Sequence, residues 1–330
     1  MNIDYQGISI YYSHYIMHLM YSILKRFSNR DLLRIRKLIT DILSIKLPYR
    51  EQSKLFWDDN GYTRNLRIPL ANPSKDDLNI YKKYLKHEEN NQKTLLLGST
   101  PLLRSLLNEL DFKNYVVADF SFATIENSLK ELDKLGIDLD AENEIWLKSD
   151  WLEMPLEPKS FDYVVGDFVF TQIEPDKQPL FVKKISSLLK QNGNFIVRMC
   201  ICNTAFDNVD PKKIIEGILF SKTFENTVEQ RFALLYRLRD RLRDKKTQAT
   251  SPRIIVDEIL RYKTENEKEL EFLRSVLKMT LRRAEVDLPF ITQTKDELAD
   301  VISKEFLLEA SAIASDYVSD NFPIYILKKI

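Results

Sequence analysis

The stretch TLLLGSTPLLRSLL (residues 94–107) decides the fold. It reads as a short apolar strand, one glycine at Gly98, and an amphipathic helix that opens at Pro101. Nucleotide-binding turns usually carry three glycines, which let a pyrophosphate approach the backbone closely. Because only Gly98 is present here, the turn predicts a helix N-terminus that receives a single carboxylate, with Thr100 as the capping residue.

Downstream of this stretch, short apolar runs alternate with helical ones. This alternation indicates an α/β layer with a parallel sheet. A helix at 294–304, an apolar run from Phe306 and a last strand at 322–330 resume the pattern near the end of the chain. Expected strands are 94–97, 115–118, 145–148, 161–165 and 194–200, and expected helices are 101–110, 121–135 and 176–190.

The regions that flank this layer have a different character. Residues 8–55 carry helical periodicity up to a stop at Pro48, residues 56–75 read as a loop, and Ser74 is placed to cap a helix through Leu85. Residues 205–288 are charged and almost wholly helical, which indicates an insertion. The predicted domains are therefore a helical N-terminal region or lid (1–90), the α/β core (91–204), a helical substrate cap (205–288) and the C-terminal part of the core (289–330).

Composition places the chain among ordinary globular proteins. It has 330 residues, 44% hydrophobic and 30% charged, with 49 basic and 49 acidic side chains. The balanced charge argues against bulk attraction to nucleic acid or membrane as the main activity. The only cysteines, Cys200 and Cys202, predict buried thiols in a reducing cytoplasm, and no cleavable signal precedes the chain's first helix.

Three acids follow separate predicted strands. Asp119 closes YVVADFS, 21 positions after Gly98, which suits a carboxylate that accepts both ribose hydroxyls. Asp150 stands beside Trp151 after the third strand, where a carboxylate and a ring can hold an adenine amine. Asp167 follows the fourth strand. Since the carboxyl ends of parallel strands meet at one edge, we expect the three acids to converge on one crevice, although many strand ends carry an acid for structural reasons alone.

Together these motifs resemble the class I S-adenosylmethionine (SAM)-dependent methyltransferases over residues 60–200 and 290–330. The segments LLLGSTPLLRSL, VVADFS, SDWLEMPLEPKSFDYVVGDFVF and LLKQNGNFIVR, with NPSKDDLNIYKKYL upstream, look like a subgroup whose first motif reads leucine-glycine-x-threonine-proline. The resemblance implies a Rossmann-like sheet of seven strands, of which the last is antiparallel.

The resemblance also assigns the cofactor site. It implies that Gly98, Ser99, Thr100 and Pro101 surround the methionine portion of SAM, and that Asp167 lies near the sulfonium and the acceptor. Asp119 would hold the ribose, Asp150 and Trp151 would flank the adenine, and Phe120 is a further cofactor-binding residue. Arg64, in the loop GYTRN, is a further candidate for pairing with the SAM carboxylate.

Methyl transfer needs little more than alignment, because positioning alone supplies about 7–11 kcal/mol. An acceptor that must lose a proton also needs a base, for which Asp167 and His14 are the candidates. His14 and His18 share a helix face, where they either reach the acceptor pocket or pack with polar tips at the surface. The only other histidine is His87, so we expect no metal site.

Several alternatives stay open from the sequence. Aminopropyl transfer, NAD-dependent redox chemistry and non-catalytic SAM binding suit the same turns, although the missing glycines disfavour NAD. The basic run YRLRDRLRDKKTQ (236–248) either contacts RNA phosphates or is a solvated helix face. A small-molecule acceptor is the first expectation, followed by peptide and RNA; the sequence predicts no oligomeric state.

Overall fold

The computed structural model describes residues 47–60, 71–85, 92–137, 139–221, 223–224, 227–318 and 320–330. Division of the chain by its internal contacts places residues 48–330 in one unit, and the following description concerns that unit alone. The expected helices before Pro48, His14 and Arg64 lie outside the described residues.

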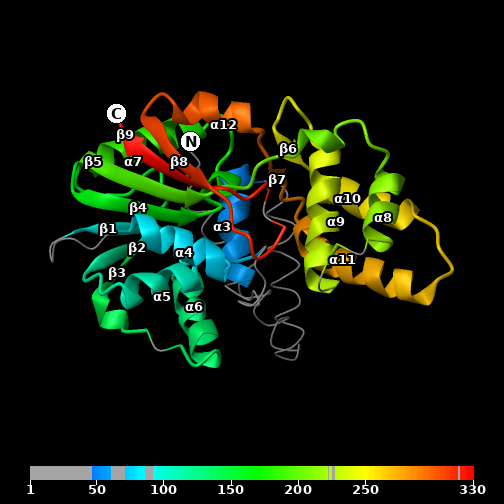
Figure 1. The fold of residues 1–330 in the computed structure, drawn as a ribbon, viewed down its shortest axis with the longest axis horizontal. Coiled ribbons are helices and arrows are strands. Elements are labelled where there is room, and N and C mark those ends of the chain that lie inside the picture. Colours follow the sequence, from blue (N-terminus) through cyan, green and yellow to red (C-terminus); the bar gives the residue numbers. More distant parts are fainter. Residues whose placement is uncertain are drawn as a thin grey trace, which may run out of the picture. The chain divides into compact units, whose positions relative to one another are not determined.

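A seven-stranded sheet forms the core, with strand order β3-β2-β1-β4-β5-β9-β8 (Figure 1). Strands β1 to β5 run parallel to one another, and β9 runs antiparallel between β5 and β8. This confirms the expected Rossmann-like methyltransferase sheet with an antiparallel last strand. The strands are β1 Thr94–Leu97, β2 Tyr115–Asp119, β3 Glu144–Lys148, β4 Phe161–Asp167, β5 Leu189–Arg198, β8 Phe306–Ala312 and β9 Ile324–Lys329.

Helices cover both faces of the sheet because alternate residues of each strand point to opposite sides. Leu95 and Leu97 pack with the apolar side chains of α7 and α12, whereas Leu96 packs with those of α4, α5 and α6. All three leucines are essentially without solvent exposure. The covering helices are α4 Lys75–Tyr84, α5 Pro101–Glu109, α6 Phe122–Lys134, α7 Gln178–Leu188 and α12 Lys295–Ile302.

The region between β5 and α12 is helical, as expected, and has an apolar core of its own. Its helices are α8 Pro211–Leu219, α9 Thr227–Arg241, α10 Pro252–Arg261 and α11 Glu267–Glu285. A two-stranded sheet of β6 Ala249–Thr250 and β7 Phe290–Ile291 closes the region, so a short strand beyond residue 288 pairs within it. Single-turn helices complete the elements: η1 Ala141–Asn143, η2 Val169–Gln172 and η3 Thr204–Phe206.

Three expectations about local structure are wrong. Helix α3, Tyr49–Asn60, begins directly after Pro48 and occupies the first part of the segment read as a loop, because a proline is accommodated at a helix start. The helix expected through residue 190 ends at Leu188, and the following residues pair in β5. Strand β5 ends at Arg198, so Cys200 and Cys202 lie beyond it.

Helix α4 starts as the sequence predicts. Ser74 caps it through a full capping box with Asp77, in which the Ser74 hydroxyl accepts from the Asp77 amide at 3.0 Å and the Asp77 carboxylate accepts from the Ser74 amide at 2.9 Å. Among the described helices, none combines the length and the apolarity that crossing a membrane requires.

Candidate functional site

A cavity of about 700 Å³ opens at the carboxyl edge of the sheet. Its lining includes the turns after β1, β2, β4 and β5, which is where open α/β sheets bind their ligands. Helices α9 and α11 supply a second large part of the lining, and Ala71, α3, η2 and β7 contribute the remainder. We call these two parts the strand-end half and the helical half. Strand-end lining residues are Leu97, Gly98, Ser99, Thr100, Asp119, Phe120, Thr124, Trp151, Asp167, Phe168 and Cys200.

The turn after β1 depends on Gly98. Its φ of +79° lies in the left-handed region, and its amide donates to the Ala118 carbonyl of β2 at 2.8 Å. Thr100 occupies the capping position of α5, as predicted, but its hydroxyl accepts no capping hydrogen bond. The Ser99 and Thr100 amides have no hydrogen-bond partner among the described residues. The turn therefore offers backbone donors to a ligand, with Pro101 starting the helix behind them.

Asp119 joins the first two turns. Its carboxylate accepts from the Ser121 amide at 2.9 Å and from the Ser99 hydroxyl at 3.3 Å. Only 6% of the residue is exposed, and that small exposed surface faces the cavity. The carboxylate is thus oriented by the backbone on one side and by Ser99 on the other.

The Asp150–Trp151 pair is split between two cavities. The Trp151 indole donates to the Ala118 carbonyl at 2.8 Å, and its ring lies beside Gly98, so it forms the floor of the main cavity. Asp150 instead lines a small adjoining cavity of about 40 Å³, where it pairs with Arg50 of α3. Phe120 and Trp151 belong to the lining of both cavities. Of the three predicted acids, Asp119 and Asp167 therefore share the main cavity and Asp150 borders it.

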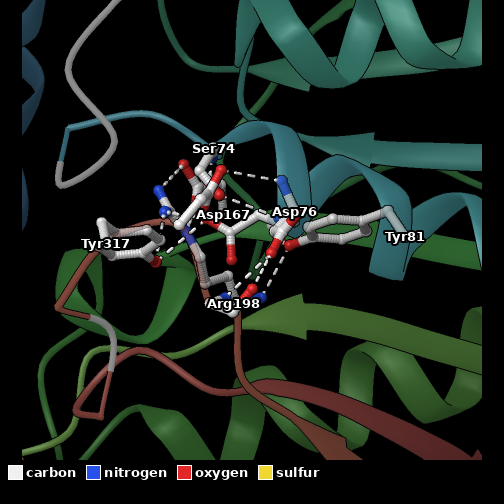
Figure 2. Close-up of polar contacts among 10 residues, drawn as sticks. Ser74, Asp76, Tyr81, Asp167, Arg198 and Tyr317 are labelled. Atoms are coloured by element: carbon white, nitrogen blue, oxygen red, sulfur yellow. Dashed lines mark hydrogen bonds and ion pairs between the residues drawn. The ribbon is translucent and has the colours of Figure 1, made fainter.

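Asp167 is held by a residue that the sequence analysis did not single out. Arg198, at the end of β5, is fully buried and donates to both Asp167 oxygens, at 2.7 and 3.1 Å (Figure 2). Its guanidinium also lies 4.2 Å from the centre of the Phe168 ring. Phe168 has a φ of +54°, an unfavourable conformation for a bulky residue, which turns the chain sharply after Asp167.

Arg198 also neutralises a second carboxylate. Asp77 of α4 accepts from Arg198 at 2.8 Å and from the Tyr317 hydroxyl at 3.1 Å, through the same oxygen that closes the capping box. Burial raises the pKa of Asp77, although Arg198 opposes this effect. Tyr81 donates to the Gly166 carbonyl at 2.6 Å, and burial raises its pKa well above the ordinary value. A signal for this cluster was present: NPSKDDLNIYKKYL and FIVR both stood among the motifs.

The helical half of the cavity has another composition. Every basic side chain in the lining comes from α9 or α11, and aromatic side chains stand between them. The lining residues of α9 are Val228, Arg231, Phe232, Leu235, Tyr236 and Arg239, and those of α11 are Met279, Arg282 and Arg283.

The basic run 236–248 is exposed only in part: Lys245 and Lys246 reach solvent, whereas Arg239 and Arg243 do not. Arg239 is buried, pairs with Asp240 at 2.6 Å and donates to the Cys200 sulfur at 2.9 Å. Arg243, whose side chain is 5% exposed, pairs with Glu297 of α12. These arginines hold the helical region to the core. Cys200 and Cys202 are buried free thiols, as predicted. Within the described ranges, no group of His, Cys, Asp and Glu side chains is arranged to hold a metal ion.

Comparisons with known proteins bear on the same region. Residues 97–197 match the family model described as "Methyltransferase domain". The match supports a class I methyltransferase core that uses SAM as its cofactor, and it spans the turns after β1, β2, β3 and β4. No curated protein matches the sequence.

Solved structures resemble the chain at low identity. A protein from Rhodobacter sphaeroides, described as a putative Zn-dependent alcohol dehydrogenase, is 16% identical with a TM-score of 0.51, over 84% of this chain and 98% of that one. Geranyl diphosphate C-methyltransferase from Streptomyces coelicolor is 8% identical, with a TM-score of 0.48 over 86% and 99%. A SAM-dependent methyltransferase from Methanosarcina mazei is 11% identical, with a TM-score of 0.46 over 76% and 97%. At these identities the likeness concerns the fold.

Proposed function

We propose that this protein is a SAM-dependent methyltransferase of the LGxTP subgroup, acting on a small-molecule acceptor by in-line transfer. The observation that carries the proposal is the joint position of the Gly98 turn and the Asp119 carboxylate in one cavity, inside the segment that matches the methyltransferase model. The cavity volume of about 700 Å³ falls within the roughly 300–1,000 Å³ typical of small-ligand sites. The buried free thiols support a reducing compartment, which we propose is the cytoplasm.

The residues present fit the cofactor. Unpartnered amides at Ser99 and Thr100 suit the carboxylate of its methionine portion, together with the proposed contact from Arg64. We assign Asp119 to the ribose hydroxyls, Phe120 and Trp151 to the walls around the adenine, and Asp150 to its amine. The Arg50–Asp150 pair lies next to this position, so an adenine amine would share the carboxylate with a guanidinium. When bound, SAM supplies a methyl group on a positively charged sulfur.

Asp167 contributes a fixed negative charge in this proposal. Both of its oxygens accept from Arg198, so the carboxylate is poorly placed to take a proton from an acceptor. It is well placed to hold negative charge at the end of β4, near which the resemblance to the methyltransferases implies the sulfonium. His14 stays the proposed base for an acceptor that must lose a proton. Alignment of the acceptor by the helical half supplies the remaining catalysis.

The NAD-dependent alternative predicts a different ligand from the methyltransferase proposal, so ligand binding distinguishes the two. We expect S-adenosylhomocysteine (SAH) to raise the melting temperature in proportion to its binding, and NAD to leave it unchanged. Thermal unfolding with each compound at matched concentrations measures this. Stabilisation by NAD and not by SAH would reject the methyltransferase proposal.

The ribose assignment has its own test. Asp119→Ala should weaken SAH binding by about 1.5–3 kcal/mol, because a charge-assisted hydrogen-bond partner is lost. Titration calorimetry measures the affinity. Glu126→Ala, on the exposed side of α6, is the control and should bind SAH as the unmodified protein does. An unchanged affinity of Asp119→Ala removes the assignment.

A further inference from the structure

The charge of the cavity lining is divided between its two halves. Its acidic members, Asp119 and Asp167, stand at strand ends, whereas its four basic members stand on α9 and α11. A cationic sulfonium suits the first half. The second half, where the acceptor would lie if the proposed function is right, presents positive charge instead.

Three of the four arginines have recorded partners. Arg239 pairs with Asp240 at 2.6 Å, and Arg282 with Glu285 at 3.2 Å. Arg283 donates to the Leu288 and Pro289 carbonyls, at 2.9 and 3.2 Å. These contacts fix the positions of the three guanidinium groups. Acidic side chains neutralise Arg239 and Arg282.

Arg231 is different. Its Nε atom is buried and has no hydrogen-bond partner, and the side chain forms no ion pair with any described residue. Arg231, Leu235 and Arg239 recur every four residues, so they share one face of α9, and all three line the cavity. A buried guanidinium donor without an acceptor is unfavourable, and native structures usually meet such a donor with a partner or a ligand.

Aromatic side chains share the cavity lining with Arg231. Phe232 and Tyr236 stack on each other with ring centres 6.0 Å apart, and both line the cavity. On the other side, Phe290 lies under the Arg283 guanidinium at 4.6 Å. A ligand that satisfies Arg231 therefore also contacts flat apolar side chains.

We propose that the acceptor is a small organic anion, in which a carboxylate or phosphate group binds Arg231 and an apolar, ring-containing body lies against the aromatic side chains of α9. That this anion is the methyl acceptor rests on the proposed function, whereas binding of an anion at Arg231 does not depend on SAM. The guanidinium fork matches a planar carboxylate or two phosphate oxygens, and aromatic walls favour a flat body. The chain thereby separates the two charges it binds, the cation at the strand ends and the anion at the helices.

The test compares charged and uncharged probes of one shape. SAH-saturated protein is titrated near neutral pH with 4-hydroxybenzoate, with phenyl phosphate and with uncharged 4-hydroxybenzamide. We expect at least one anion to bind roughly tenfold more tightly than the amide, and Arg231→Met to reduce the preference to about twofold or less. The more tightly bound anion distinguishes a carboxylate site from a phosphate site.

The matched control is Arg237→Met. Arg237 stands on the same helix but packs over Phe206 and Phe224, at 5.3 and 5.8 Å, and is not part of the lining. It should keep the anion preference of the unmodified protein. Arg231→Gln serves as a second variant, and SAH affinity reports whether each variant is folded.

Two results would overturn the proposal. One is equal binding of the amide and both anions by the unmodified protein; the other is an anion preference that survives in both Arg231 variants. Failure of SAH to bind would instead reject the proposed function, and titration of the protein without SAH then still decides whether the anion site exists.

Discussion

The strand-end half of the cavity and the helical half hold their polar groups in position in different ways. In the first, turns of the backbone fix the polar groups: the Gly98 amide donates to β2, and the Asp119 carboxylate accepts from the Ser121 amide of its own turn. In the second, long arginine side chains project from helices that have their own apolar core. Backbone turns define one geometry for one constant ligand, whereas side chains on helices can be exchanged without disturbing the sheet. In the function that we propose, the turns of the sheet therefore bind the cofactor and the helices bind the acceptor.

The largest expected effect concerns the charge beneath the strand-end half. Arg198→Met leaves Asp77 and Asp167 buried without their cation, so we expect the free energy of unfolding to fall by about 3–5 kcal/mol. Urea unfolding measures it. Lys190→Met, which breaks an exposed pair with Asp162, should cost about 0–1 kcal/mol. Arg231→Met in the helical half should show no comparable loss. A loss of similar size in both halves would contradict the comparison.

The turn after β1 gives a second, smaller effect. Gly98→Ala places a side chain at a φ of +79°, although the nearest atom, in Trp151, leaves ordinary van der Waals distance at 3.5 Å. We expect about 1–2 kcal/mol of lost stability from backbone strain and a weaker affinity for SAH. Gly136→Ala, at a φ of +67° with nothing within 4 Å, is matched in strain and remote from the cavity. It should lose stability and keep SAH affinity; equal SAH binding by both variants would separate the turn from the cofactor.

The smallest effect tests how the helical region is attached to the core. The pKa of Glu297 is lowered. Burial alone would raise it, but hydrogen bonds from Arg243 and from the Thr294 amide outweigh the effect of burial. The ionised group therefore stabilises the fold above its unfolded pKa, and this contribution is lost as pH falls through the folded pKa. Glu297→Gln should cost about 1 kcal/mol at neutral pH and progressively less below about pH 4.

Urea unfolding at several pH values measures the Glu297 effect. Glu126→Gln is the control, since its pair with Lys130 is exposed and should contribute little at any pH. A cost for Glu297→Gln that stays constant with pH would mean that packing, and not the charge, joins Arg243 to α12.

Much of the sheet could be predicted because its signals are local. Buried strands such as Thr94–Leu97 are continuous apolar runs bounded by turn residues, and the alternation with amphipathic helices defines the layer. The errors arose where the same local sequence is compatible with two kinds of secondary structure. Leu189, directly after the end of the helix, is an apolar residue that suits a helix or a strand, and its pairing with Phe161 of β4 decides between them. Pro48 similarly marks a helix end or a helix start.

The site was predictable only in part. Gly98, Asp119 and Asp167 each follow a strand, so sequence order alone locates them at one edge. Arg198 also ends a strand, but its role cannot be predicted from that position alone. It depends on contact with Asp77, which is 121 positions away in the chain. Arg231 was missed for a related reason: it precedes the basic run in the sequence, and only the folded structure shows that no described residue accepts a hydrogen bond from its Nε atom.

Asp77 carries a consequence for the whole site. One oxygen of its carboxylate closes the first turn of α4 and also neutralises the guanidinium that orients Asp167. Fraying of the first turn of α4 would therefore remove the Asp77 contact of Arg198, and Asp167 would lose the fixed position that Arg198 gives it. In the function that we propose, the orientation of Asp167 at the cofactor therefore depends on the first turn of α4, a helix that precedes the first strand in the chain.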